Sequence, residues 1–154
     1  MHPVSGIFHN HVLFAGLLGW FIAQALKIPI HYIMEKEWDF GRFHGSGGMP
    51  SSHTAMTVAA TVLAGALHGF DSPLFGLGVI FTSVIMYDAT GVRRETGRQA
   101  TIINRIIDLV HVKGKPITTV ELKEMVGHKP IEVAGGALLG VIIAGVYILI
   151  LMNH

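Results

Sequence analysis

Two histidines stand in short polar segments that each lead into a long apolar run. His53 closes the stretch GGMPSSH, and His128 opens the stretch HKPIE. Proline is favoured in the first turn of a helix, so both segments are predicted to be helix N-termini. Free backbone amides at such ends favour a bound anion, and an imidazole can transfer protons or attack as a nucleophile. The pattern therefore predicts a phosphoryl-transfer site.

The first segment offers groups that can bind an anion. Gly47 and Gly48 let a ligand approach the backbone closely, and Ser51 and Ser52 add hydroxyls to the amides of the helix start. His53 follows directly, where it can give a proton to a leaving oxygen. The same residues also suit a simple polar helix cap that binds no ligand.

The second segment pairs its histidine with a carboxylate. His128 and Glu132 are four residues apart, so they lie on one face of the predicted helix. A carboxylate that holds one ring nitrogen leaves the other nitrogen available as a nucleophile or a base.

Four apolar runs are long enough to position these segments as membrane helices. They cover residues 12–33, 50–70, 73–89 and 131–152, and a spanning helix needs about 20 residues. Only 14% of the residues are charged, compared with about 25% in soluble domains. We predict a single all-α membrane domain over residues 1–154, a polytopic bundle of four transmembrane helices. No basic leader precedes the first run, so we expect no cleaved signal peptide.

The segment between the third and fourth predicted spans carries an amphipathic helix. In RRETGRQATIINRIIDLV, isoleucine and valine share one helical face, and arginine, threonine and aspartate share the other. Such a helix either lies at the cytoplasmic interface with its basic face toward lipid headgroups or packs over the bundle with solvated arginines.

All the basic residues fall on one side of the predicted bundle. They are Lys27, Lys36, Arg42, Arg93, Arg94, Arg98, Arg105, Lys113, Lys115, Lys123 and Lys129. The positive-inside rule places this side in the cytoplasm and both termini outside. Both histidine segments open on the same side. We expect an integral protein of a bacterial-type plasma membrane whose site faces the cytoplasm.

Neither the carboxylates nor the histidines predict a metal site. Asp88 is the only carboxylate in the stretch DATGVRR, and it cannot by itself hold a pair of metal ions. We expect it to pair with Arg93 or Arg94 at the membrane edge, because an unpaired carboxylate there is costly. The histidines near the N-terminus have no carboxylate close to them and are interpreted as interfacial side chains.

Three stretches together resemble the divergent branch of the type-2 phosphatidic acid phosphatase family, which is related to acid phosphatases and vanadium-dependent haloperoxidases. The stretches are GGMPSSHTA, YDATGVRRETGRQA and LKEMVGHKPIEVAGGALLG. PSSH is similar to the superfamily's Pro-Ser-Gly-His motif, with Ser52 in place of glycine. HKPIE is similar to its His-x-x-x-Asp motif, with Glu132 in place of aspartate. The likeness covers nearly the whole chain.

The resemblance implies an integral membrane phosphatase that hydrolyses a lipid phosphate monoester. It makes His128 the nucleophile that becomes phosphorylated, Glu132 the residue that orients it, and His53 the acid that protonates the departing alcohol. The phosphate would be held by hydroxyls and basic side chains, namely Ser51, Ser52, Lys36, Arg42, Arg93, Arg94, Arg98 and Lys123. Members of the family are typically metal-independent, so no metal or other cofactor is implied.

A second interpretation is a non-catalytic protein that binds lipid phosphates or assists membrane assembly and retains the phosphatase fold. Leu122 favours it, because the superfamily has an arginine six residues before the motif histidine. Lys123 or an arginine from residues 93–98 would substitute in an active site. Under either interpretation the expected partners are the lipid bilayer and a lipid phosphate, and no nucleic acid. The spacing of Gly136 and Gly140 suits close helix packing, either within one chain or in a homo-oligomer.

Overall fold

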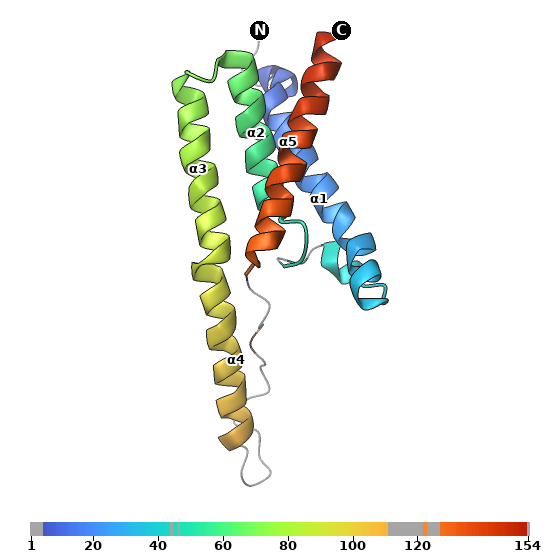
Figure 1. The fold of residues 1–154 in the computed structure, drawn as a ribbon, viewed down its shortest axis with the longest axis vertical. Helices are drawn as coiled ribbons and strands as arrows, with labels where there is room; N and C mark the ends of the chain where they lie inside the picture. The colour runs from blue at the N-terminus through green and yellow to red at the C-terminus, as the bar shows by residue number, and fades with distance from the viewer. Residues whose placement is uncertain (1–4, 44, 46, 111–121, 123–126, 154) are drawn as a thin grey trace.

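All regular elements are helices in the part of the chain that the computed structural model describes. That part comprises residues 5–43, 45, 47–110, 122 and 127–153 (Figure 1). The helices are η1 Ser5–His9, α1 His11–Glu35, η2 Phe40–Phe43, α2 Ser52–His68, α3 Pro73–Thr90, α4 Val92–Val110 and α5 Pro130–Met152. The predicted all-α class is confirmed.

Four of these helices form an up-and-down bundle, with both chain termini at the same end (Figure 1). Helix α2 lies at the centre and packs against α1, α3 and α5. The turn from α2 to α3 lies at the end of the bundle that carries the termini, and the connection from α1 to α2 lies at the opposite end. The N-terminal ends of α2 and α5 therefore meet at that opposite end.

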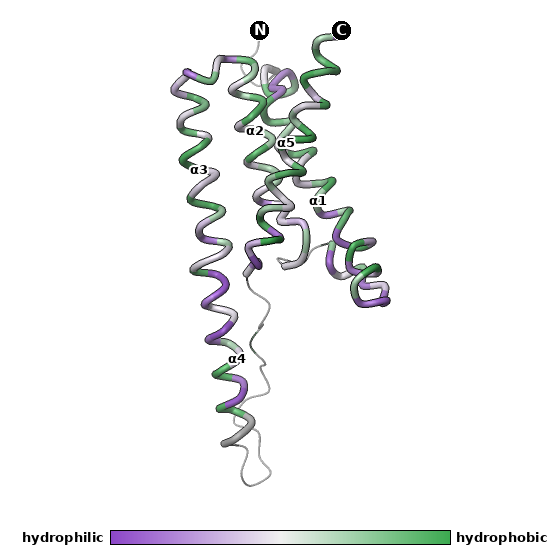
Figure 2. Tube along the Cα trace, viewed as in Figure 1, coloured by the Kyte–Doolittle hydropathy of each residue, from purple (hydrophilic) through white to green (hydrophobic). Residues whose placement is uncertain are grey.

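Among the described residues, three helical segments are long and apolar enough to cross a membrane. They are His11–Glu35, Pro73–Ile107 and Pro130–Met152. Helix α2 has 17 residues and is shorter, although its position agrees with the second predicted span. Large exposed side chains on α3 and α5 are apolar, as the green stretches of these helices show (Figure 2). Such a surface suits contact with lipid tails.

Small residues let α1 and α5 approach the backbone of α2 from two sides. A Cβ atom at Gly19 of α1 or at Gly140 of α5 would lie 2.8 Å from the Ala55 carbonyl oxygen. A Cβ atom at Gly136 would collide with the carbonyl oxygen of Ser51. The spacing of Gly136 and Gly140 thus brings together two helices of one chain, as small residues do in membrane bundles.

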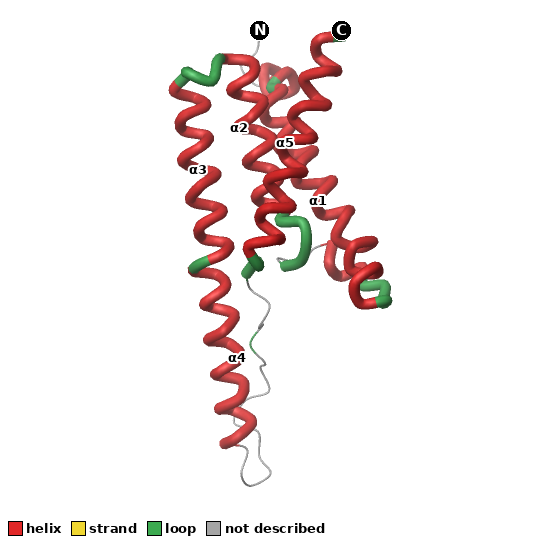
Figure 3. Tube along the Cα trace, in the orientation of Figure 1, coloured by secondary structure: helices red, strands yellow, loops and turns green. Residues whose placement is uncertain are grey.

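Helix α4 continues the axis of α3 and extends beyond the other helices (Figure 1). Gly91 alone separates α3 from α4, at the short green break in the long rod (Figure 3). The Gly91 amide donates to the Tyr87 carbonyl at 2.8 Å, and the Glu95 amide donates to the Gly91 carbonyl at 3.0 Å. Because helical hydrogen bonds run through the junction, the chain keeps its direction. The predicted amphipathic helix is present, but it runs along the bundle axis and neither lies across the bundle's end nor packs over it.

Candidate functional site

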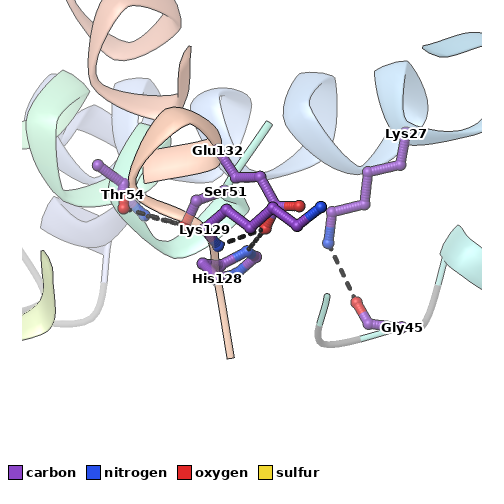
Figure 4. Close-up of polar contacts among 7 residues, drawn as sticks. All are labelled: Lys27, Gly45, Ser51, Thr54, His128, Lys129 and Glu132. Carbon is purple, nitrogen blue, oxygen red and sulfur yellow. Dashed lines mark hydrogen bonds and ion pairs between the residues drawn. The ribbon is translucent and has the colours of Figure 1, made fainter. Parts of the chain in front are cut away.

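The N-terminus of α5 holds His128 and Glu132 in contact (Figure 4). The Nδ1 atom of the buried His128 ring lies 2.9 Å from the Glu132 Oε2 atom. The same carboxylate oxygen accepts a hydrogen bond from the Lys129 backbone amide at 3.1 Å. Glu132 thereby caps the helix, and the cap fixes its carboxylate beside the ring. A proton on Nδ1 leaves a lone pair on Nε2, the nitrogen that can attack an electrophile.

Backbone contacts hold the segment before α5 against the long α3–α4 rod. The His128 amide donates to the Ala89 carbonyl at 3.0 Å. A Cβ atom at Gly127 would collide with the backbone of α4, so this glycine permits the close approach. Farther along, the Asn104 side chain donates to the Leu122 carbonyl at 2.9 Å and accepts from the Leu122 amide at 3.1 Å. The rod therefore supports the segment that carries His128.

The hydroxyl of Ser51 caps α2. It accepts hydrogen bonds from the Thr54 hydroxyl at 2.9 Å and from the Thr54 amide at 3.4 Å. The Ser51 amide donates to the Glu132 carbonyl at 2.9 Å, which ties the start of α2 to the start of α5. Ser51 and Ser52 are both buried, and neither lines the two cavities described next.

A cavity of about 140 Å³ brings the two predicted catalytic histidines together. His53 of α2 and His128 both line it. Asp88 and Arg93, from the two sides of the α3–α4 junction, line it too and form an ion pair with each other. That pairing agrees with the expectation for Asp88. We call this space the histidine cavity; its other lining residues are Ile85, Ala89 and Gly127.

A second cavity, of about 200 Å³, gathers basic side chains, and we call it the basic cavity. Lys27, Arg42 and Lys129 line it together with Glu132. Lys27 belongs to α1, and its side chain is buried. Its Nζ atom donates to the Gly45 carbonyl, in the α1–α2 connection, at 3.1 Å (Figure 4). Glu132 lines the basic cavity and bonds His128, which lines the histidine cavity. The bonded pair therefore links the two cavities.

Comparison with known proteins bears on this arrangement. The sequence profile of the divergent PAP2 family matches residues 8–143. The chain belongs to the divergent PAP2 family. A protein of Bacillus subtilis (strain 168), named "Uncharacterized membrane protein YuiD", is 40% identical over 144 residues, which cover 87% of this chain and 91% of that protein. No solved structure matches the chain.

This divergent PAP2 protein is an integral membrane protein, and the family match spans every residue that lines either cavity. Of the predicted phosphate-binding side chains, Arg42 lines the basic cavity and Arg93 lines the histidine cavity. Lys36 is exposed just beyond the end of α1 and lines neither. Arg94 and Arg98 are exposed on α4 and also line neither cavity. The Arg98 Nη1 atom lies 3.4 Å from the Glu95 Oε2 atom. The remaining predicted residue, Lys123, lies outside the described residues.

Sequence reasoning did not single out two basic residues that line the basic cavity, Lys27 and Lys129. The family resemblance implied Lys36 together with Arg42, whereas Lys27 lines the basic cavity with Arg42. The missed signal is the position of Lys27 inside an apolar run. An ionisable side chain at such a position is costly and marks a functional site by default.

Proposed function

We propose that this divergent PAP2 protein hydrolyses a lipid phosphate monoester through a phosphohistidine intermediate on His128. The observation that carries the proposal is the cavity shared by His53 and His128, with Glu132 bonded to the His128 ring. Two imidazoles beside one phosphate can divide nucleophilic attack and proton transfer between them.

The reaction has two steps. In the first, the His128 Nε2 lone pair attacks phosphorus, the bond from phosphorus to the lipid oxygen breaks, and His53 gives that oxygen a proton. The lipid leaves as an alcohol. In the second, His53 takes a proton from water, the water oxygen attacks phosphorus, and the phosphorus–nitrogen bond breaks to release inorganic phosphate. Glu132 stabilises the positive charge on the ring during both steps.

Positive side chains supply the electrostatic part of the mechanism. Phosphoryl transfer depends mainly on positioning and on charge around the transferred group. Arg93 serves this role within the histidine cavity, and Lys27, Arg42 and Lys129 add positive charge from the basic cavity. The exposed arginines of α4 attract anionic lipid to this end of the bundle, by about 1 kcal/mol each near the surface.

We also propose that α2 is a fourth membrane span, because it lies at the centre of the bundle between helices that are long enough to cross. The basic end faces the cytoplasm of a bacterial-type plasma membrane, and both termini lie outside. The substrate is then an anionic lipid of the cytoplasmic leaflet. Since the Gly136–Gly140 pair packs within one chain, a homo-oligomer would have to use another surface.

The test is phosphate release by the purified protein from a panel of lipid phosphates. We expect turnover that vanadate inhibits and that His53→Ala and His128→Ala each lower by about 100-fold or more. His68→Ala is the matched control, because His68 is an exposed histidine at the other end of α2. Its turnover should equal that of the wild type. Turnover that survives both cavity substitutions contradicts the mechanism.

A non-catalytic lipid-phosphate binder is the second candidate. One observation favours it: Leu122 supplies no cation, and its backbone is engaged by Asn104. The two candidates differ in one measurement. Retention of the protein on vesicles that carry a phosphomonoester lipid, without release of phosphate from any member of the panel, supports the binder.

A further inference from the structure

An open apolar groove with a volume of about 630 Å³ runs along the crevice between α2 and α3. Residues between 56 and 64 of α2 form one wall, and residues between 74 and 84 of α3 form the other, with Val12 of α1 at the far end. Ten residues of helix span about 15 Å. That length is about half the ~30 Å thickness of the hydrocarbon core of a bilayer. The groove is therefore about as long as one acyl chain.

One end of the groove lies beside the histidine cavity. On α2, His53 lines the cavity, while Met56 and Thr57, one turn later, line the groove. On α3, Ile85 lines the cavity and its neighbour Val84 lines the groove. The crevice thus changes from polar to apolar along its length, as a phospholipid does from its phosphate to its chains.

The walls of the groove offer hydrocarbon to whatever occupies it. Its two hydroxyl side chains are both bonded within the protein. The Thr57 hydroxyl donates to the His53 carbonyl at 3.1 Å, and the Thr61 and Thr82 hydroxyls lie 3.1 Å apart. The other lining residues are glycine, alanine and larger apolar residues. Such walls bind an apolar ligand and carry no group that would orient a polar one.

We propose that this groove binds one acyl chain of the lipid whose phosphate enters the histidine cavity. The inference rests on the proposed function for the identity of the headgroup, but it does not require turnover. A lipid suits the site better than a helix from a second copy, because a lipid offers a phosphate to the polar histidine cavity and an apolar chain to the groove beside it.

The groove positions the lipid more than it increases the affinity for the lipid. An acyl chain that leaves the bilayer for the groove exchanges one apolar environment for another, so burial by itself drives little binding. A chain held along α3 instead aims its phosphate at the histidine cavity, and correct aim lowers the barrier of the reaction. We therefore expect the groove to select lipids by chain length and to act on kcat/KM.

Filling the groove tests the proposal, and α3 offers a matched control. Thr57→Phe places a ring in the groove and removes a hydroxyl that bonds only carbonyls of its own helix. Ser83→Phe makes a similar change at an exposed position, where the lost hydroxyl also bonds a carbonyl of its own helix, that of Val79, at 2.8 Å. Ser83 lines neither the groove nor the two cavities.

The first measurement is photolabelling in phosphatidylcholine vesicles that contain a trace of phosphatidic acid with a diazirine in its acyl chain. We expect label on residues 52–68 and 73–90, lowered about tenfold by Thr57→Phe and unchanged by Ser83→Phe. The same diazirine carried on phosphatidylcholine should label the groove less. Equal labelling by both probes, or labelling that Thr57→Phe leaves intact, overturns the proposal.

The second measurement is kcat/KM for lipid phosphates of increasing chain length in detergent micelles. Thr57→Phe should lower the value for long chains about tenfold more than the value for the shortest substrate. An equal loss of kcat/KM at every chain length overturns the proposal. If the wild type releases no phosphate at all, the proposed hydrolysis fails while photolabelling still decides the groove. The chain has no cysteine, so a disulfide formed between two copies of Leu77→Cys would reveal that a second copy occupies the groove and would also overturn the proposal.

Discussion

The Oε2 atom of Glu132 bonds both the His128 ring and the Lys129 backbone amide. One oxygen thus caps α5 and fixes the orientation of the imidazole. Because the Glu132 carbonyl also accepts the Ser51 amide, the same residue joins the two helix starts from which the histidine cavity is built. Orientation of the ring and assembly of the site are therefore consequences of one local structure.

Glu132→Gln separates the charge of this residue from its shape. The amide can still cap the helix through its oxygen, but it cannot balance the positive charge that develops on the His128 ring. We expect kcat to fall by about 100-fold or more with a melting temperature close to that of the wild type. Glu37→Gln, at an exposed loop position, is the control. Equal kcat values for the two variants would show that the carboxylate has no role in turnover.

Lys27→Met tests the basic cavity. The substitution keeps the length of a buried side chain but removes its charge and its hydrogen bond to the α1–α2 connection, so stability should fall by about 1–3 kcal/mol. Binding of inorganic phosphate should weaken by about 10- to 150-fold, because one charge-assisted contact is worth about 1.5–3 kcal/mol. The measurements are product inhibition by inorganic phosphate and thermal unfolding. Lys36 is exposed and lines neither cavity. Lys36→Met should therefore change neither the inhibition by phosphate nor the thermal unfolding.

The helices could be predicted from the sequence because their limits are written in local residue types. Each apolar helix begins and ends within two residues of its predicted run. The direction of α4 could not be predicted in this way. Gly91 looks like a break in the sequence, yet the hydrogen bonds on either side of it keep α3 and α4 on one axis. Whether the chain changes direction at a glycine depends on its backbone geometry, which the residue types do not specify.

The candidate site was predictable in part for the same reason. His128 and Glu132 are one helical turn apart, so their contact follows from spacing alone. The meeting of His53 with His128 depends on the chain returning along the α3–α4 rod, through contacts such as the His128 amide with Ala89. The position of Lys27 inside an apolar run is a local signal, but its meeting with Arg42 in the basic cavity depends on how α1 packs against its neighbours, which no local pattern specifies.

Arg93 and Arg98 form a matched pair for testing the electrostatic contribution. Each is exposed and pairs with an acidic residue nearby, but only Arg93 lines the histidine cavity. Surface ion pairs contribute about 0–1 kcal/mol, so neither Arg93→Gln nor Arg98→Gln should unfold the protein. We expect Arg93→Gln to lower kcat/KM by about 100-fold and Arg98→Gln to leave it near the wild-type value. Similar losses in both would indicate general attraction of lipid by α4.

The close approach of α5 to α2 predicts opposite effects for two glycine-to-alanine substitutions on one helix. A methyl group at Gly140 would lie 2.8 Å from the Ala55 carbonyl oxygen and from the Val58 side chain, whereas nothing lies within 4 Å of one at Gly145. Gly140→Ala should therefore destabilise the protein by about 1–3 kcal/mol through overpacking. Gly145→Ala should stabilise it by up to about 1 kcal/mol, because alanine is the better helix former. Thermal unfolding in detergent measures both, and a Gly140→Ala protein as stable as Gly145→Ala would mean that α2 and α5 are not packed backbone to backbone.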